Sequence, residues 1–380
     1  MKGNRLTALI FIVIALSAAF YAGIDFNGKH VDEEIYPGMG VTRVKMLSEY
    51  FPGLKGTPGD TEIYVMEGEK EGGSMLVLGG THPNEPSGVV SAVMMIEQAK
   101  VNTGTLYIIP SSNRSAFTHN DATEGSPNTY TIGDRTFRYG SRATNPVHQW
   151  PDPDVYVHAS GQKLSGSETR NLNRSYPGRP DGTLTEKISY GITQLIKAED
   201  ITVTVDMHEA SPEYPVINAT VAHERAMGIA SSAVINMQLE GVDMGLEPSP
   251  LNLRGLTHRE LGDYTNTYAL LMETANPAQG RLRGATNEDL VLTGIDPLYV
   301  QANDHGKVFV DFDENGHPLR QRVARQVTGI VEFAKALTDL EPHNTLIIEN
   351  LPTYDQLMDN GLTAYLAPQG SDQRFATGDK

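Results

Sequence analysis

Apolar and polar positions in the first half of the chain follow a pattern that predicts a strand–helix–strand order. Residues 75–80 begin with an apolar run that predicts a strand, residues 89–99 form an apolar segment that predicts a helix, and residues 105–110 predict the next strand. Units of this kind usually pair their strands in parallel and place helices on both faces of the sheet. The pattern therefore predicts an α/β fold, in which ligands bind at the carboxyl ends of the strands.

Further elements are predicted toward the carboxyl terminus. Thr183 and Glu186 have the spacing of a helix capping box, and apolar residues follow them at helical spacing. The remaining predicted elements are strands at 201–209, 268–273 and 307–310 and helices at 223–239 and 320–337. The acidic stretch 311–316 begins like a calcium loop but lacks the closing glutamate, so a surface hairpin turn explains it better.

Residues 111–180 carry no apolar periodicity and are far longer than an ordinary connection. We expect this insertion to form the wall of a substrate pocket. The arginines from Arg135 to Arg179 lie within it, and we expect them to make the pocket locally positive in an acidic protein. His223 is expected to be an exposed residue at the start of a helix, without a ligand role.

The amino terminus has the form of an export signal or a membrane anchor. Two basic residues precede a long apolar stretch, and Ser17 and Ala19 suit cleavage after small residues. As a helix, residues 6–24 would span roughly 28 Å, which just matches a hydrocarbon core of about 30 Å. Residues 1–24 therefore predict an exported protein, periplasmic or extracellular, which contacts the membrane only through this segment if it is not cleaved.

The composition favours one large domain and excludes several classes of function. The chain has 380 residues, of which 39% are apolar, enough for a large core. Its formal net charge of −17 opposes binding to nucleic acid and to anionic lipid surfaces. The absence of cysteine excludes disulfides and cysteine-ligated metals. We expect a catalytic domain at 74–340, an extension at 25–73 and another at 341–380 whose last ten residues are disordered.

Two histidines and a glutamate follow predicted strands in positions that suit a metal site. His82 and Glu85 lie three residues apart after a Gly-Gly turn, and His208 lies at the end of the strand at 201–209. These side chains are zinc ligands, and three of them leave a fourth position open for water, as in catalytic sites. A His-x-x-Glu pair alone is more often a surface turn, but the third residue favours a site for one Zn²⁺ ion.

Other polar residues are candidates for catalysis and binding. Glu273 ends an apolar segment and precedes a proline-containing loop, so it is the candidate general base, with strand capping or an ion pair as the alternative. Asn173 and Arg174 lie in a polar loop, where an amide and a forked guanidinium can clamp a substrate carboxylate.

In type and order these motifs resemble those of the zinc carboxypeptidase superfamily, in particular its succinylglutamate desuccinylase and aspartoacylase branch. The similar stretches, between about residues 75 and 276, are Gly-Gly-Thr-His-x-Asn-Glu, Asn-Leu-Asn-Arg-x-Tyr-Pro-Gly, Asp-Met-His and Met-Glu-Thr-Ala. The resemblance implies a zinc-dependent amide hydrolase with a mixed, mostly parallel central sheet and helices on both faces. The roles it implies are zinc ligands for His82, Glu85 and His208, a carboxylate anchor for Asn173 and Arg174, and the base for Glu273.

The arginine that polarises the scissile carbonyl in that family has no motif to place it in this chain. Arg142 is favoured because the nearby Gly140 lets the backbone approach a ligand. Arg170, four residues before Arg174, is the second choice for this arginine and is also a candidate substrate-binding residue. Glu209 directly follows His208 and could compete as base or ligand, but adjacent strand residues point to opposite faces.

The expected function is hydrolysis of an amide bond by a zinc-bound water and the glutamate base. The expected substrate is a small N-acyl amino acid or a short peptide that carries a carboxylate. Two alternatives stay open at this point: an exported metallocarboxypeptidase that acts on peptides, and a non-catalytic envelope binding protein on the same scaffold.

Overall fold

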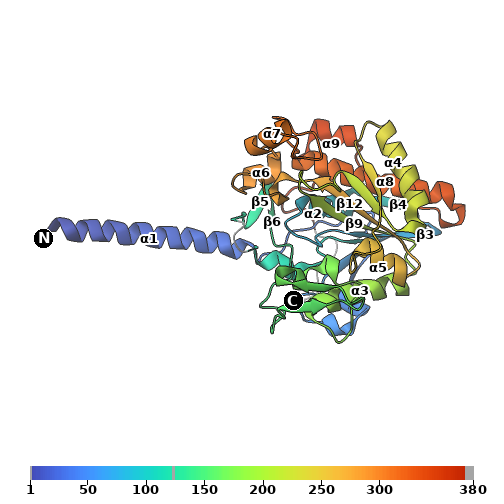
Figure 1. The fold of residues 1–380 in the computed structure, drawn as a ribbon, viewed down its shortest axis with the longest axis horizontal. Helices are drawn as coiled ribbons and strands as arrows, with labels where there is room; N and C mark the ends of the chain where they lie inside the picture. The colour runs from blue at the N-terminus through green and yellow to red at the C-terminus, as the bar shows by residue number, and fades with distance from the viewer. Residues whose placement is uncertain (1, 122–124, 373–380) are drawn as a thin grey trace.

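The computed structural model describes residues 2–121 and 125–372, and its body is built on one mixed sheet (Figure 1). Within these residues nine strands join in the sheet, in the order β1-β2-β4-β3-β9-β12-β10-β11 with β13 paired to β4. The strands are β1 Arg43–Met46, β2 Glu62–Glu67, β3 Lys70–Leu78, β4 Lys100–Ile109, β9 Val203–Ala210, β10 Ala219–Ala222, β11 Gly245–Pro248, β12 Tyr268–Ala275 and β13 Ile347–Glu349. The four central strands run parallel, and antiparallel pairs add β2, β10 and β13, so the predicted mixed sheet is confirmed.

Helices cover both faces of this sheet, because successive side chains of its central strands point to opposite sides. On β3, Met75 and Val77 pack against α2, α4 and α8, whereas Leu76 and Leu78 pack on the other face with α3 and α5 (Figure 1). The helices are α1 Lys2–Gly28, α2 Pro86–Gln98, α3 Leu184–Ala198, α4 Met227–Leu239, α5 Thr257–Tyr264, α6 Glu288–Thr293, α7 Pro297–Asp304, α8 Leu319–Leu340 and α9 Tyr354–Asn360. The predicted helices on both faces are therefore confirmed.

The amino-terminal helix α1 extends away from the body as one long rod (Figure 1). Residues Asn4–Gly28 are apolar enough and long enough to cross a membrane, and their large apolar side chains are exposed. The apolar segment recognised in the sequence is thus a helix that does not pack into the core, a form shared by signal sequences and membrane anchors.

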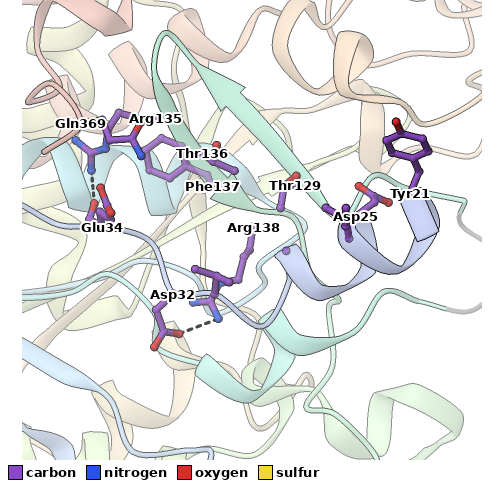
Figure 2. A pocket seen from close by; sticks show the side chains of 13 residues that line it. Tyr21, Asp25, Asp32, Glu34, Thr129, Arg135, Thr136, Phe137, Arg138 and Gln369 are labelled. Atoms are coloured by element: carbon purple, nitrogen blue, oxygen red, sulfur yellow. Dashed lines mark hydrogen bonds and ion pairs between the residues drawn. The ribbon is translucent and has the colours of Figure 1, made fainter. Parts of the chain in front are cut away.

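The segment that follows α1 is fixed to the body by two arginines of β6 (Arg135–Arg138). Asp32 forms an ion pair with Arg138 at 3.0 Å, and Arg135 donates a hydrogen bond to the carbonyl of Glu34 (Figure 2). A cavity of about 440 Å³ lies between the base of α1, this segment and the hairpin that β6 forms with β5 (Thr129–Ile132). The base of α1 is therefore attached to a folded surface.

Two sequence predictions outside the site are wrong. Residues 307–310 form no strand, because the Phe309 N–H donates to the Pro212 carbonyl of a loop at 2.8 Å and finds no neighbouring strand. His223 does precede a helix, but it is only 3% exposed, since its ring lies 3.1 Å from the carboxylate of Asp263.

The insertion at 111–180 contains short elements that its sequence pattern does not reveal. These are the β5–β6 hairpin and a second hairpin of β7 (Val155–Val157) and β8 (Lys163–Ser165). Residues 25–73 supply β1 and β2 to the main sheet, and the boundary expected at residue 73 falls inside β3. The disorder predicted for the last ten residues concerns mainly residues 373–380, which lie outside the described residues.

A buried ion pair joins α8 to the sheet. Glu209 of β9 and Arg322 of α8 meet at 2.7 Å, and both side chains are fully buried. The amide of Asn276 donates to the same carboxylate at 3.0 Å. Glu209 therefore faces α8, on the opposite side of the sheet from its neighbour His208.

We expect the replacement Arg322→Ala to lower the free energy of unfolding by about 3–5 kcal/mol, because it leaves the Glu209 carboxylate buried without its charge partner. Chemical denaturation measures this loss. The double replacement Glu209→Leu with Arg322→Leu removes both charges and should lower the free energy of unfolding by less than the single replacement does. A single variant as stable as the unchanged protein would contradict this account of the pair.

Candidate metal centre and active site

The three predicted ligands come together at the carboxyl end of the central strands. His82 and Glu85 lie between β3 and α2, and His208 lies near the end of β9, which pairs in parallel with β3. The two imidazole rings are 4.6 Å apart between centroids. His82 Nδ1 lies 2.7 Å from one oxygen of Glu85, and His208 Nδ1 lies 2.8 Å from the other. All three side chains are buried.

Two glycines allow close packing around the ligands: Gly80 lets the loop after β3 approach the end of β4, and Gly88 lets the start of α2 approach β9. Gly80 has φ +64°, and a Cβ there would lie 2.8 Å from the Pro110 carbonyl oxygen. A Cβ on Gly88 would lie 2.6 Å from the Met207 carbonyl oxygen, so a larger residue would push α2 away from β9. This close packing brings Glu85, at the amino end of α2, between the two histidines.

Each histidine has a second partner behind it. His82 Nε2 lies 2.8 Å from Asn171 Oδ1, and His208 Nε2 lies 2.7 Å from Asp206 Oδ2. Asp206 also accepts hydrogen bonds from the hydroxyls of Thr81 and Thr257, both at 2.8 Å. Such partners fix the ring orientation and leave Nδ1 of each ring directed at the other ligands, as is usual for metal-bound histidine.

The donor atoms fit a divalent ion of the zinc type. The two Nδ1 atoms are 3.1 Å apart, and each is 2.7–2.8 Å from a Glu85 oxygen. Ligand atoms of a tetrahedral zinc site lie about 3.3 Å apart, and two imidazoles with one carboxylate are a known catalytic donor set. With Nε2 of both rings facing an acceptor, the Nδ1 lone pairs and the carboxylate point at one another, an arrangement that a cation satisfies.

Burial and neighbouring charges both shift the pKa values of the three ligands, in opposite directions for Glu85 and His208. Burial alone would raise the pKa of Glu85, but His82 and His208 outweigh it and hold the pKa of this carboxyl well below its usual range. Burial lowers the pKa of His82. For His208, Asp206 and Glu85 together outweigh burial and raise its pKa.

Glu273 lies beside His208 on the same face of the sheet. The two residues are direct partners in the parallel pairing of β12 with β9. Oε2 of Glu273 is buried without a hydrogen-bond partner among the described residues. Burial, assisted by the charges of Glu85 and Asp206, raises the pKa of Glu273 to about 8, although His208 and Arg142 oppose the shift. The side chain is therefore suited to holding a proton near neutral pH.

Arg142 reaches the cluster from the insertion. Its NH1 lies 3.5 Å from both His82 Nδ1 and Glu85 Oε1, and its Nε lies 3.2 Å from Glu168 Oε1. Arg170 has different neighbours, because its Nε pairs with Asp152 at 2.9 Å. The structure thus brings Arg142 to the candidate site and holds Arg170 at another carboxylate.

The predicted Asn173–Arg174 pair lies beside the cluster. Oδ1 of Asn173 accepts the backbone N–H of Thr257 at 2.9 Å, and its Nδ2, the atom that could donate to a carboxylate, lies 3.5 Å from His208 Nε2. The guanidinium of Arg174 donates to the Asn173 carbonyl and lies 3.5 Å from Glu168 Oε2, with the side chain 17% exposed. The role of this pair as a carboxylate anchor stays a prediction.

Each of the arginines from Arg135 to Arg179 has a carboxylate partner within the fold, and the locally positive pocket expected from them stays a prediction. The pairs are Arg135 with Glu97, Arg138 with Asp32 and Glu33, Arg142 with Glu85 and Glu168, Arg170 with Asp152, Arg174 with Glu168, and Arg179 with Glu186.

Sequence reasoning missed three residues of the site. Asp206 and Asn171 orient the ligands, and Glu168 joins two arginines. Asp206 carried a signal, since it is two residues before His208 and so lies on the same face of the strand. Asn171 and Glu168 lie in irregular backbone, where no periodicity indicates which way a side chain points.

No protein-family model matches the chain. Among curated proteins, the chain is similar to an N-alpha-acetyl-L-2,4-diaminobutyric acid deacetylase from Halomonas elongata, with 27% identity over 201 residues. The match covers 47% of this chain and 53% of the other, so the chain spans about half the length of this curated relative.

Two solved structures illustrate the likeness of fold. One is a succinylglutamate desuccinylase from Silicibacter sp. TM1040, with 19% identity, 58% of this chain and 55% of that chain covered, and a TM-score of 0.36. The other is the tripeptide-bound cell shape determinant Csd4 from Helicobacter pylori, with 11% identity, 80% and 60% covered, and a TM-score of 0.46. The motifs of the chain are what resembles the succinylglutamate desuccinylase and aspartoacylase branch.

We expect Asn171→Ala to weaken zinc binding by about 10–100-fold, because His82 loses the partner that orients its ring. Competition with a chromogenic chelator measures the affinity. Asn145→Ala is the matched control, since Asn145 donates to Thr118 and has no contact with the cluster among the described residues. Equal zinc affinity in the two variants would contradict the orienting role.

Proposed function

We propose that this protein is a zinc-dependent amide hydrolase that removes the acyl group from an N-acyl amino acid. The observation that carries the proposal is the convergence of His82, Glu85 and His208 beside Glu273 and Arg142 at one edge of the sheet. The similarity to a curated deacetylase supports the same class of reaction. A peptide substrate and a binding protein without activity are the competing outcomes of the tests below.

His82, Glu85 and His208 would hold one zinc ion. When bound there, zinc polarises a carbonyl oxygen and lowers the pKa of water to about 7. Glu273, whose Oε2 has no hydrogen-bond partner among the described residues, would accept the proton of the attacking water and deliver it to the leaving amine.

Arginines position the substrate on the insertion side of the cluster. Arg142 reaches within 3.5 Å of two ligands, so its guanidinium can donate to the scissile carbonyl oxygen as negative charge develops on it. Arg174 binds the carboxylate of the amino acid with the forked geometry that favours such pairs. Arg170, already paired with Asp152, supports the wall of the pocket.

His208→Ala is expected to lose both zinc and activity, because it removes one of three ligands. Glu273→Gln is expected to retain zinc and to lose at least about 100-fold in kcat, because it removes the proton acceptor. Metal analysis of the purified variants and release of amino acid from N-acyl substrates measure these effects.

The same experiment separates the alternatives. Loss of zinc in Glu273→Gln would assign this glutamate to the metal and not to proton transfer. A protein loaded with zinc that releases no product from N-acyl amino acids or short peptides would contradict a hydrolase and favour a binding protein.

We further propose that the chain is exported through α1. Its apolar surface, which does not pack on the body, supports this proposal. A fusion of alkaline phosphatase to the carboxyl terminus should be active in a Gram-negative host and inactive when residues 2–24 are deleted. A fusion to green fluorescent protein is the reciprocal control, and equal phosphatase activity with and without the helix would contradict export through α1.

A further inference from the structure

Glu168 places a negative charge between the two arginines of the candidate site. Its Oε1 pairs with Arg142 Nε at 3.2 Å, and its Oε2 lies 3.5 Å from Arg174 Nε. The amide of Asn171 donates to Oε2 at 2.9 Å. The side chain of Glu168 remains 37% exposed, so its carboxylate is held in place and still open to a ligand.

Two side chains, Arg142 and Asn171, each link Glu168 directly to the metal ligands. Arg142 contacts Glu168 with Nε and approaches His82 and Glu85 with NH1 at 3.5 Å. Asn171 donates to Glu168 and lies 2.8 Å from His82 through its Oδ1. Because the proposed function puts the α-carboxylate of the substrate on Arg174, 3.5 Å from Glu168, the amino-acid part of the substrate would lie next to Glu168.

The charges around Glu168 favour a substrate that carries one carboxylate, or one carboxylate together with a cationic group. Arg142 and Arg174 offer two positive charges, and Glu168 offsets one of them. Arg142 is also shared with Glu85. With the α-carboxylate of the substrate on Arg174, and Arg142 shared between Glu168 and Glu85, a second substrate carboxylate at Glu168 would find both nearby guanidinium groups already engaged.

Resting on the proposed function, we propose that Glu168 makes the site selective for N-acyl amino acids with a cationic side chain, such as N-acyl diamino acids. The α-carboxylate binds Arg174, and the side-chain ammonium pairs with the exposed carboxylate of Glu168. A substrate with a second carboxylate is rejected, because like charges face each other at contact distance in a partly desolvated site.

The test compares three N-acetyl amino acids of similar size with different side-chain charge: 2,4-diaminobutyrate, norvaline and glutamate. For the zinc-loaded protein, kcat/KM should fall in that order, by at least about tenfold from the cationic to the anionic compound. Glu168→Gln keeps the size and the hydrogen-bonding capacity but removes the charge, and it should reduce this ratio about tenfold. Glu168→Asp keeps the charge and should preserve the order.

Asp152→Asn is the matched control, because Asp152 pairs with Arg170 in the same insertion and has no contact with the cluster among the described residues. It should leave the ranking of the three compounds unchanged. Thermal unfolding and zinc content of each variant confirm that the proteins are folded and loaded.

Equal kcat/KM for the three compounds, or an unchanged ranking in Glu168→Gln, would overturn the selectivity while leaving the hydrolase in place. If no compound is hydrolysed, the proposed function fails. The three compounds are then ranked by their dissociation constants, measured by titration calorimetry. Tightest binding of the cationic compound, lost in Glu168→Gln, would still support the inference, and equal constants would overturn it.

Discussion

The parallel register of three strands is the constraint on which the site depends. β9 pairs with β3 so that Leu78 lies opposite Asp206, and with β12 so that Glu273 lies opposite His208. Directly paired residues of a sheet share a face and are separated by the spacing of neighbouring strands, about 4.8 Å. A shift of one residue in β12 would turn Glu273 to the other face, so the register fixes the proton acceptor beside the metal ligand.

The same register distributes buried charge over both faces of the sheet. On one face Asp206 holds His208, and on the other Glu209 holds Arg322 of α8. Removing one member of such a pair leaves an uncompensated charge, which is far more unfavourable than losing an exposed pair. The strand end that presents the ligands is therefore anchored from both sides, and α8 also contacts it directly, because Gln326 donates to the His208 carbonyl at 2.8 Å.

Much of the fold and the ligand positions followed from the sequence because strands and strand ends have a regular geometry. Apolar runs predicted β3, β9 and β12, and polar residues just beyond them had to meet at one edge. The insertion has no such regular geometry. Whether Arg142 or Arg170 reaches the metal ligands depends on which carboxylate each one pairs with, Glu168 for Arg142 and Asp152 for Arg170, and the sequence does not indicate these pairs. The strand predicted at 307–310 failed for a related reason, because an apolar run needs a neighbouring strand that the sequence does not identify.

Side-chain contacts, and not a helical repeat, align three polar residues of an irregular loop. Glu168 lies in the 3-10 helix Gly166–Arg170 and Arg174 in the next one, Leu172–Arg174, but Asn171 between them is extended, with φ −77° and ψ 117°. The amide of Asn171 donates to Glu168 at 2.9 Å while its oxygen lies 2.8 Å from His82 Nε2, and Arg174 Nε lies 3.5 Å from the same Glu168 carboxylate. Because one amide contacts both the metal ligand and the carboxylate, the extended residue between the two helices couples the orientation of His82 to the charges beside it.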